Sequence, residues 1–359
     1  MDNLFVDLKE HSYYIYIEKN FDNLCNVLKE TGIFNKILIV TDSNVEKLYL
    51  KEVYQRLSDF GYDVGVSVFN AGEANKNMDT ILKICNDCIK HGMDRKSSVV
   101  AVGGGVVGDM AGFAASIYMR GINFVQVPTT LLSQSDSSVG GKTGIDFGGA
   151  KNILGAFHQP KAVYINVDTL KTLPKQEFIS GMGEVIKHGI IRDGNFFEYL
   201  TKNNEKIKKL DPDVLTKTVY TNCAIKSKVV EMDEKEYGVR ADLNFGHTIG
   251  HAIESYSDYK YTHGACVGVG MLAASYIAFN RGMITERELD KIKDLLLMYD
   301  FDIKFEISDK QAIIKLMNMD KKKVGGKINF ILPAQIGEVK KYDDISVTEI
   351  DAALDFISK

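Results

Sequence analysis

The sequence has few cysteines, little net charge and no long apolar run among its 359 residues. Five scattered cysteines do not make the disulfide framework of a secreted protein at this length, so a reducing compartment is expected. The longest nearly uncharged run, residues 265–279, is shorter than the roughly 20 residues that a membrane helix needs. The first residues lack the cationic stretch and apolar run of a signal peptide. These absences predict a cytoplasmic protein with no membrane partner.

The charge balance is slightly acidic, with 44 basic and 48 acidic side chains and a net charge of −4. Such a chain is not expected to bind nucleic acid, and an anionic ligand would need a local cluster of basic residues. The chain also exceeds the roughly 100–150 residues of an ordinary domain, which predicts two domains. Apolar residues make up 45% of the sequence, enough to form a substantial core.

The first half of the sequence alternates strand-like and helix-like segments. Strands are predicted at residues 36–41, 64–69, 98–102, 124–127 and 162–167, and helices at 44–60, 80–90 and 106–118. This alternation predicts an α/β domain over residues 1–173 with a doubly wound, mainly parallel sheet, to which a hairpin at residues 5–17 adds an edge. Helical patterns dominate from residue 174, so residues 174–359 are predicted to form a mainly α-helical domain. We expect the active site in the cleft between the two domains.

A glycine-rich segment, GGGVVGD at residues 103–109, follows a predicted strand and opens a predicted helix. Glycines let a pyrophosphate approach the backbone, and the first N–H groups of the helix can bind the anion. The loop follows the third or fourth strand, however, and no acidic residue stands about 20 positions later, as the dinucleotide fingerprint requires. A tight turn with close helix packing therefore remains an alternative. Asp42 ends an earlier strand and could bind a ribose or cap a helix.

Histidines gather in one stretch of the second half. His247 and His251 are four residues apart, so they share one face of a helix, and His263 follows soon after. Glu184 lies in another helical segment. A carboxylate with two imidazoles is a suitable ligand set for a catalytic zinc ion. Spacing alone favours His247 and His251 as the ligand pair, with the alternative that one of them is an acid–base group.

Several cations lie in apolar or glycine-rich settings, which suggests a site for phosphate and carboxylate groups. They are Arg120, Lys142, Lys151, Lys187, Lys226 and Arg240. The segment Gly141-Lys142-Thr143 is similar to the end of a P-loop, but the required glycine five residues earlier is Asp136, which argues against an ATPase.

Long motifs in one order make the chain resemble the 3-dehydroquinate synthases, a family of sugar-phosphate cyclases. The segments are GGGVVGDMAGFAA (103–115), Arg120, VPTTLL (127–132), DSSVGGKTGID (136–146), KNILGAFHQP (151–160), SGMGEVIKHG (180–189), Arg240 and LNFGHTIGHAIE (243–254). The resemblance covers nearly the whole chain. The related glycerol-dehydrogenase-type enzymes would not be expected to share the DSSVGGKT and KN segments.

The resemblance implies a lyase reaction that converts 3-deoxy-D-arabino-heptulosonate 7-phosphate to 3-dehydroquinate and inorganic phosphate, a step of the shikimate pathway. It implies tightly held NAD and one divalent metal, usually zinc, with cobalt as an alternative. NAD oxidises the C5 hydroxyl, the ketone acidifies C6, phosphate is eliminated, and the hydride returns. The ring then opens, and an intramolecular aldol step closes the carbocycle. The phosphate of the substrate can itself take the proton during elimination.

The resemblance also implies a role for each matching residue. The metal ligands are Glu184, His247 and His263, rather than the pair that spacing favours. The catalytic and hydroxyl-orienting residues are His251, Lys187, Asp136 and Asn244. The substrate-binding residues are Arg120, Lys142, Asn152, Lys226, Arg240 and a lysine of the run that contains Lys321 and Lys322. The NAD-binding residues are Asp42, Glu73, Lys76, Gly104, Gly105, Val106, Val107, Gly108, Asp109, Thr129, Thr130, Lys142, Lys151, Thr169, Leu170, Lys171 and Thr172.

Four positions, in three segments, depart from the family pattern. Ala265-Cys266 replaces the usual Glu-Ala, Ser135 replaces a valine, and Asp146 replaces an asparagine. We expect these changes to affect local packing, with Cys266 as a small core residue. The alternatives are another cyclase, such as a 2-deoxy-scyllo-inosose or epi-valiolone synthase, and a metal-dependent polyol dehydrogenase. We expect a homodimer, with Arg120 reaching across it.

Overall fold

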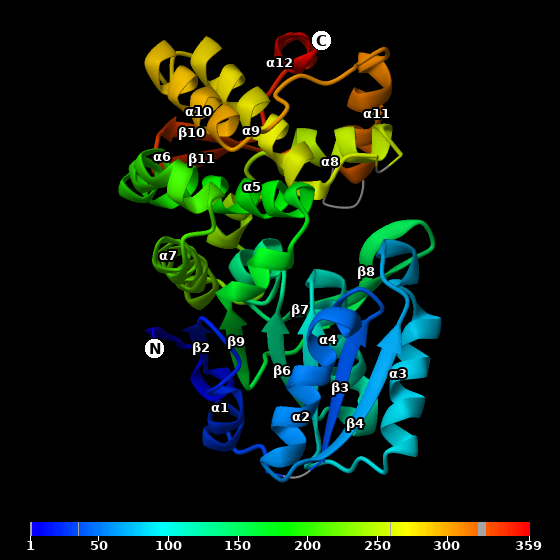
Figure 1. Cartoon of the computed structure of the whole chain (residues 1–359). Coiled ribbons are helices and arrows are strands. Elements are labelled where there is room, and N and C mark those ends of the chain that lie inside the picture. Colours follow the sequence, from blue (N-terminus) through cyan, green and yellow to red (C-terminus); the bar gives the residue numbers. More distant parts are fainter. Residues whose placement is uncertain (1, 35, 259, 322–327) are drawn as a thin grey trace. The chain divides into compact units, whose positions relative to one another are not determined.

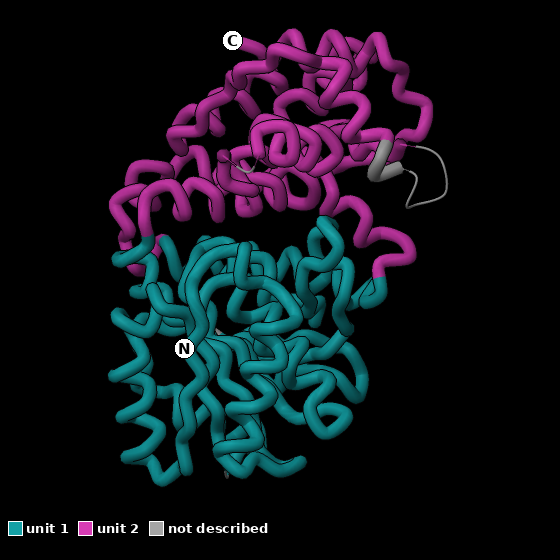
Figure 2. The backbone as a smooth tube through the Cα atoms, turned by 90° about the vertical axis from the view of Figure 1, so that its right-hand side faces the viewer, with its two compact units in different colours: residues 1–173, 215–235 teal, residues 174–214, 236–359 magenta. Residues whose placement is uncertain are grey.

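The computed structural model describes residues 2–34, 36–258, 260–321 and 328–359 (Figure 1). The chain forms two compact units (Figure 2). Unit 1 contains residues 1–173 and 215–235, and unit 2 contains residues 174–214 and 236–359. The predicted division after residue 173 falls where the first stretch of unit 1 ends. Residues 215–235, which the prediction placed in the second domain, pack with unit 1.

Unit 1 is built on a seven-stranded sheet with the strand order β1-β2-β9-β6-β5-β3-β4. Its strands are β1 (Asp2–Val6), β2 (Tyr13–Glu18), β3 (Lys36–Asp42), β4 (Asp63–Phe69), β5 (Ser98–Gly103), β6 (Asn123–Pro128) and β9 (Ala162–Asn166). All neighbours are parallel except β1, which pairs antiparallel with β2. The mainly parallel sheet and its edge hairpin are therefore confirmed.

Both faces of this sheet are buried, which explains its continuous apolar strands. In β3, Ile37 and Ile39 enter one hydrophobic core, while Leu38 and Val40 enter the other. Helices α1 (Leu24–Glu30) and α2 (Lys51–Asp59) supply the first core, and α3 (Met78–Lys90) and α4 (Gly105–Ile117) supply the second. Burying each such aliphatic side chain stabilises the fold by about 1.5–3 kcal/mol. The strands are consequently apolar on both sides.

A second hairpin of unit 1, β7 (Lys142–Phe147) and β8 (Ala150–Phe157), was not predicted. Its sequence is rich in glycine, which has a low β-propensity and hides the strand pattern. Glycine is needed there because a Cβ atom on Gly155 would lie 2.0 Å from the Thr143 carbonyl oxygen. The hairpin presents Leu154 and Ala156 to the core beside α4.

Unit 2 is mainly helical, as predicted. Its helices are α5 (Lys175–Arg192), α6 (Gly194–Lys208), α8 (His247–Tyr256), α9 (His263–Asn280), α10 (Glu286–Met298), α11 (Lys310–Lys321) and α12 (Val347–Ile357). The hairpin of β10 (Phe330–Gln335) and β11 (Glu338–Tyr342) completes it. Helix α9 is buried over most of its length and packs against α5, α8, α10 and α12. Among the described residues, no helix is long and apolar enough to cross a membrane.

An ion pair joins the end of α9 to the start of α12. Arg281 Nη2 donates to Glu349 Oε2 over 3.1 Å, and Arg281 Nη1 donates to Asp344 Oδ1 over 2.9 Å. Glu349 also accepts the backbone N–H of Ser346, the residue that caps α12. The hydrogen bond from Arg281 lowers the pKa of Glu349 from its ordinary 4.5 to about 2.

This pair predicts a pH-dependent contribution to stability. Glu349→Gln keeps the helix cap but removes the charge, so we expect it to lower the free energy of unfolding at pH 7 by about 0.5–1 kcal/mol. As the pH falls from 4.5 towards 2, the unfolded carboxyl takes up its proton before the folded one does. In denaturant titrations, the difference in free energy of unfolding between wild type and Glu349→Gln should therefore disappear over this range. An equal difference at pH 7 and at pH 2.5 would contradict this assignment.

Candidate functional site

Three helices of unit 2 carry the acidic and histidine side chains that the sequence singled out. Glu184 lies on α5, while His247 and His263 are the first residues of α8 and α9. Small residues let these helices approach closely. A Cβ atom on Gly264 would lie 1.8 Å from the carbonyl oxygen of Ser180, so only glycine fits where α9 meets α5. The Gly264 N–H also donates to Ser180 Oγ over 3.1 Å, which fixes the start of α9 against α5.

The crossing of α8 and α9 also depends on glycine. A Cβ atom on Gly270 would lie 2.0 Å from the carbonyl oxygen of Gly246, the residue that precedes α8. Gly246 has a φ of 80°, in the left-handed region that favours glycine. Because backbone packs directly on backbone here, the rings of His247 and His263 come close, with centroids 5.3 Å apart.

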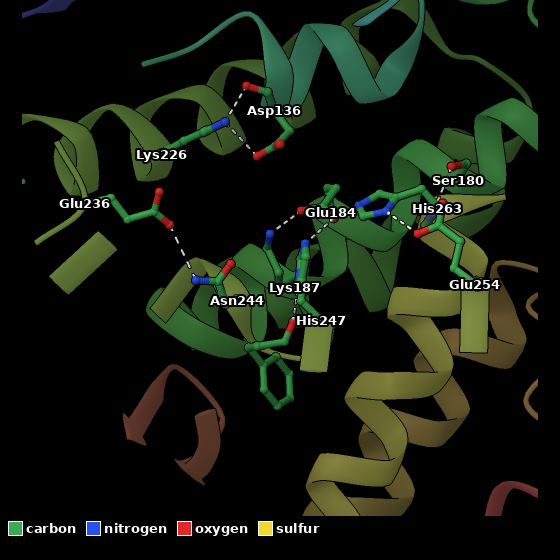
Figure 3. Close-up of polar contacts among 12 residues, drawn as sticks. Asp136, Ser180, Glu184, Lys187, Lys226, Glu236, Asn244, His247, Glu254 and His263 are labelled. Atoms are coloured by element: carbon green, nitrogen blue, oxygen red, sulfur yellow. Dashed lines mark hydrogen bonds and ion pairs between the residues drawn. The ribbon is translucent and has the colours of Figure 1, made fainter. Parts of the chain in front are cut away.

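Both histidines face one carboxylate oxygen (Figure 3). Glu184 Oε1 lies 3.6 Å from His247 Nε2 and 3.4 Å from His263 Nε2. The other oxygen, Oε2, accepts a hydrogen bond from Lys187 Nζ. Glu184 and Lys187 are both buried, and within the described part of the chain Oε1 makes no hydrogen bond. A buried carboxylate oxygen of this kind, facing two imidazole nitrogens, is suited to bind a cation.

The surrounding charges keep the carboxylate ionised. Burial alone would raise the pKa of Glu184, but Lys187 and the two histidines hold it well below its ordinary value. Burial and the Lys187 charge lower the pKa of His247 well below its ordinary value, so this imidazole is neutral and able to ligate a metal. Burial would also lower the pKa of His263, yet Glu184 and Glu254 raise it to about 9.

The spacing of these donors fits a tetrahedral zinc ion. With metal–ligand bonds of about 2.0–2.1 Å, neighbouring tetrahedral ligands lie about 3.3 Å apart. The measured separations from Glu184 Oε1 are 3.4 and 3.6 Å. His247, His251 and His263 form another group whose ring nitrogens lie within 4.8 Å of one another. His251 is exposed, however, and Glu184 supplies the buried oxygen that accepts no hydrogen bond among the described residues. The set with Glu184 is therefore the better ligand set.

In unit 1, the carboxyl ends of the strands bring the predicted nucleotide loops to one edge of the sheet. After β3 the chain places β4 on one side of β3 and β5 on the other. Open α/β sheets bind ligands at such a switch point. Asp42 ends β3, and the glycine loop follows β5, so both flank this point. Position in the sheet, rather than order along the chain, explains why the loop does not follow the first strand.

The glycine loop is shaped for an anion. A Cβ atom on Gly105 would lie 3.0 Å from Ser137 Oγ, and one on Gly104 would lie 3.1 Å from Thr130 Cγ2. Helix α4 begins at Gly105 and has no side-chain cap, so its first N–H groups can bind a pyrophosphate. Asp42 Oδ1 accepts the N–H of Asn44 over 2.8 Å. Asp42 therefore caps the segment that follows it, which was one of the two roles expected from the sequence.

A buried lysine joins the nucleotide loops to the β7–β8 hairpin. Lys76 Nζ donates to Asp109 Oδ2 over 2.7 Å and to Asn152 Oδ1 over 2.5 Å. Asp146 Oδ1 accepts the backbone N–H of Asn152, whose φ is 51°. Burial would lower the pKa of Lys76, but Asp109 and Glu73 raise it, so the lysine is charged. The sequence separated these residues into NAD-binding and phosphate-binding groups, whereas the structure places them in one network.

Helix α7 (Pro212–Met232) holds the turn that contains Asp136. Lys226 Nζ bonds the Asp136 carboxylate over 2.8 Å and its carbonyl oxygen over 2.5 Å (Figure 3). Asn222 Nδ2 donates to the carbonyl oxygen of Ser135, and Cys223 Sγ to that of Gln134. These contacts explain why residues 215–235 belong to unit 1.

Comparisons with known proteins agree on one family. The family model described as 3-dehydroquinate synthase N-terminal matches residues 66–180, and the C-terminal model matches residues 181–323. A 3-dehydroquinate synthase from Acetivibrio thermocellus is 48% identical over 340 residues, which cover 94% of both chains. The chain belongs to the 3-dehydroquinate synthase family.

Solved structures of other sugar-phosphate cyclases share the fold. A 2-epi-5-epi-valiolone synthase from Streptomyces hygroscopicus subsp. jinggangensis, with NAD⁺ and Zn²⁺ bound, has a TM-score of 0.90 at 26% identity and covers 98% of both chains. A 2-deoxy-scyllo-inosose synthase has a TM-score of 0.89 at 24% identity, covers 98% of this chain and 99% of its own, and shows the fold alone. Identity is thus much higher to the 3-dehydroquinate synthase than to these two cyclases.

The remaining predicted residues occupy several positions. Arg120, Lys142 and Lys151 are exposed in unit 1. Thr169, Leu170, Lys171 and Thr172 lie in the helical turn Val167–Thr172, where Thr169 Oγ1 accepts from Gln134 Nε2. Arg240 is buried in the turn Val239–Asn244 of unit 2. The predicted role of Lys322, and of the Lys321 side chain, lies outside the described residues.

Three side chains in or beside the family motifs were given no role from the sequence. Glu236 Oε1 lies 3.5 Å from Asn244 Nδ2, and Glu254 contacts His263. Gln134 donates hydrogen bonds to Pro128, Asn166 and Thr169 and so links three segments of unit 1. Of the three, only Glu254 could have been suspected from the sequence, because the motif that it ends places it on the same helix as His247. Among the departures from the family pattern, Cys266 is fully buried in α9 and Ala265 beside it is half-buried, so these two affect packing.

The close approach at Gly264 yields a prediction. Gly264→Ala should push α9 away from α5, move His263 from Glu184, and destabilise the protein by about 1–3 kcal/mol through overpacking. We expect purified Gly264→Ala to retain much less zinc than wild type, measured by elemental analysis. Gly194→Ala is the matched control, since its Cβ would lie 3.1 Å from the nearest atom and away from the cluster. Full zinc content in Gly264→Ala would contradict the geometry.

Proposed function

We propose that this chain catalyses the reaction of its family, the conversion of 3-deoxy-D-arabino-heptulosonate 7-phosphate to 3-dehydroquinate and inorganic phosphate. The observation that carries the chemistry is the buried Glu184 oxygen facing two imidazoles, in a chain 48% identical to a 3-dehydroquinate synthase. The substrate and product differ in composition by phosphoric acid alone, and NAD would be regenerated. The enzyme is therefore a carbon–oxygen lyase of the shikimate pathway.

Two bound groups supply the chemistry that side chains cannot provide. When bound, NAD would supply reversible hydride transfer at C5, and a divalent cation, zinc or cobalt, would supply Lewis acidity toward the C5 hydroxyl. Glu184, His247 and His263 would hold the cation. The residues at the carboxyl ends of β3 and β5, with Lys76 and Asp109, would hold NAD. The glycine loop fits this role because side chains at Gly104 and Gly105 would contact Thr130 and Ser137.

The residues around the cation have separate tasks. His251 lies on the same face of α8 as His247, with ring centroids 5.1 Å apart, so it can exchange a proton with the C5 hydroxyl. Lys187 neutralises the second oxygen of Glu184 and holds that carboxylate in place. Asn244, and Asp136 in unit 1, offer groups that would orient the substrate hydroxyls.

The anionic ends of the substrate need fixed cations and amides. Lys142, Asn152 and Arg120 would bind the phosphate, with Asn152 oriented by Lys76. Lys226 and Arg240 would bind the carboxylate. Because the substrate phosphate can take the C6 proton itself as it leaves, no further strong base is needed.

One incubation tests this function. Purified protein with the heptulosonate phosphate, NAD and zinc should release phosphate and 3-dehydroquinate in equal amounts, with no lasting rise in NADH absorbance. A polyol dehydrogenase would instead accumulate NADH without releasing phosphate. A different cyclase would leave this substrate unreacted. Either result would contradict the proposal.

We also propose a homodimer that forms through the outer face of the β7–β8 hairpin, and a cytoplasmic location consistent with the five free cysteines. Phe147, Ile153 and Phe157 are 59%, 54% and 48% exposed on this hairpin, an apolar surface that a second copy would cover. Arg120 follows α4 in a left-handed turn with a φ of 68°. It is exposed and has no ion pair among the described residues, so it is available to a neighbouring copy.

The dimer proposal predicts that Ile153→Glu lowers the sedimenting mass from two chains to one. Activity should fall with it, because Arg120 would no longer reach the other copy. Ile89→Glu is the matched control: Ile89 is 64% exposed on α3, and its change should leave the mass unaltered. An unchanged dimer in Ile153→Glu would refute the assigned face.

A further inference from the structure

Glu254 ends the motif that carries the α8 histidines, yet neither the motif nor the proposed function gives it a role. It lies on α8, two turns after His247, and is 6% exposed. Its carboxylate Oε2 lies 3.4 Å from Nδ1 of His263 (Figure 3). A buried carboxylate is costly unless it is paired, so this contact requires an explanation.

The two nitrogens of each predicted histidine ligand have different partners. His247 Nδ1 lies 3.1 Å from the carbonyl oxygen of Phe245, and His263 Nδ1 faces Glu254. Carbonyl and carboxylate oxygens can only accept hydrogen bonds, so each Nδ1 carries the proton. When a cation displaces any proton from Nε2, each Nε2 offers it a lone pair on the side of Glu184 Oε1. Proteins commonly orient metal-binding histidines in this way.

Packing alone does not fix the His263 ring. Its side chain is 31% exposed, compared with 14% for His247 and 1% for Glu184. His263 is also the first residue of α9, where a helix has few neighbouring turns to restrain a side chain. The Glu254 carboxylate therefore supplies a restraint that the surroundings do not.

We propose that Glu254 is a positioning residue that accepts the Nδ1–H of His263 and thereby aims Nε2 at a divalent cation held with Glu184 and His247. This inference rests on the proposed function, because it takes these three residues as the ligands. The added negative charge beside the ring also strengthens the lone pair on Nε2. Loss of Glu254 should weaken cation binding without removing a ligand.

The test measures zinc affinity in purified, substrate-free protein by competition with a chromophoric chelator. Glu254→Met fills a similar volume without an acceptor, so it should fold and bind zinc about 10–100-fold more weakly than wild type. Glu254→Gln retains an acceptor oxygen and should recover most of the affinity. The absorption spectrum of bound Co²⁺ should change in Glu254→Met and remain close to wild type in Glu254→Gln.

Glu288→Met is the matched control. Glu288 caps α10 in the same unit, so its replacement should lower thermal stability and leave zinc affinity unchanged. Wild-type zinc affinity in Glu254→Met would overturn the inference, as would equal weakening in Glu254→Met and Glu254→Gln. The measurement requires no turnover. A wild type that binds zinc but forms no 3-dehydroquinate would contradict the proposed function and leave this inference standing.

Discussion

The constraint on which unit 2 depends is the burial of one ionised carboxylate. Removing an ion such as Glu184 from water costs several kcal/mol unless partners replace the solvent. Its partners come from three helices: Lys187 from α5 itself, His247 from α8 and His263 from α9. These helices must therefore cross at backbone distance, and glycines at the two crossings permit it. Large apolar side chains at these crossings would hold the helices apart and separate the carboxylate and imidazole groups that a cation needs.

In unit 1, the parallel sheet brings together residues that are far apart in the sequence. Its parallel strands end at one edge, so the glycine loop after β5 and Asp42 at the end of β3 lie at the same edge of the sheet, although no sequence signal links them. Lys76 then joins this edge to Asn152 on the hairpin through a pair of hydrogen bonds. The residues proposed to hold NAD and those proposed to hold phosphate share one charged network, so a change at Lys76 affects both.

Periodicity predicted the elements that are regular, and could not predict which elements meet. Strands β3, β4, β5, β6 and β9 and helices such as α8 follow their apolar patterns. The β7–β8 hairpin was hidden by its glycines, and the pattern of α7 did not reveal that it returns to unit 1. Spacing within one helix favoured His247 with His251, because it cannot detect a carboxylate on α5. Family resemblance suggested Glu184, and the buried oxygen that faces both imidazoles gives that suggestion a physical basis.

The central claim is that Glu184, His247 and His263 together hold one divalent cation. Anomalous diffraction from crystals grown with zinc, collected on both sides of the zinc absorption edge, tests it most directly. The account predicts a single strong peak bonded to a Glu184 oxygen and to Nε2 of both histidines, at about 2.0–2.1 Å. A peak bonded to His247, His251 and His263 with Glu184 unbound, or no peak at this cluster, would contradict it.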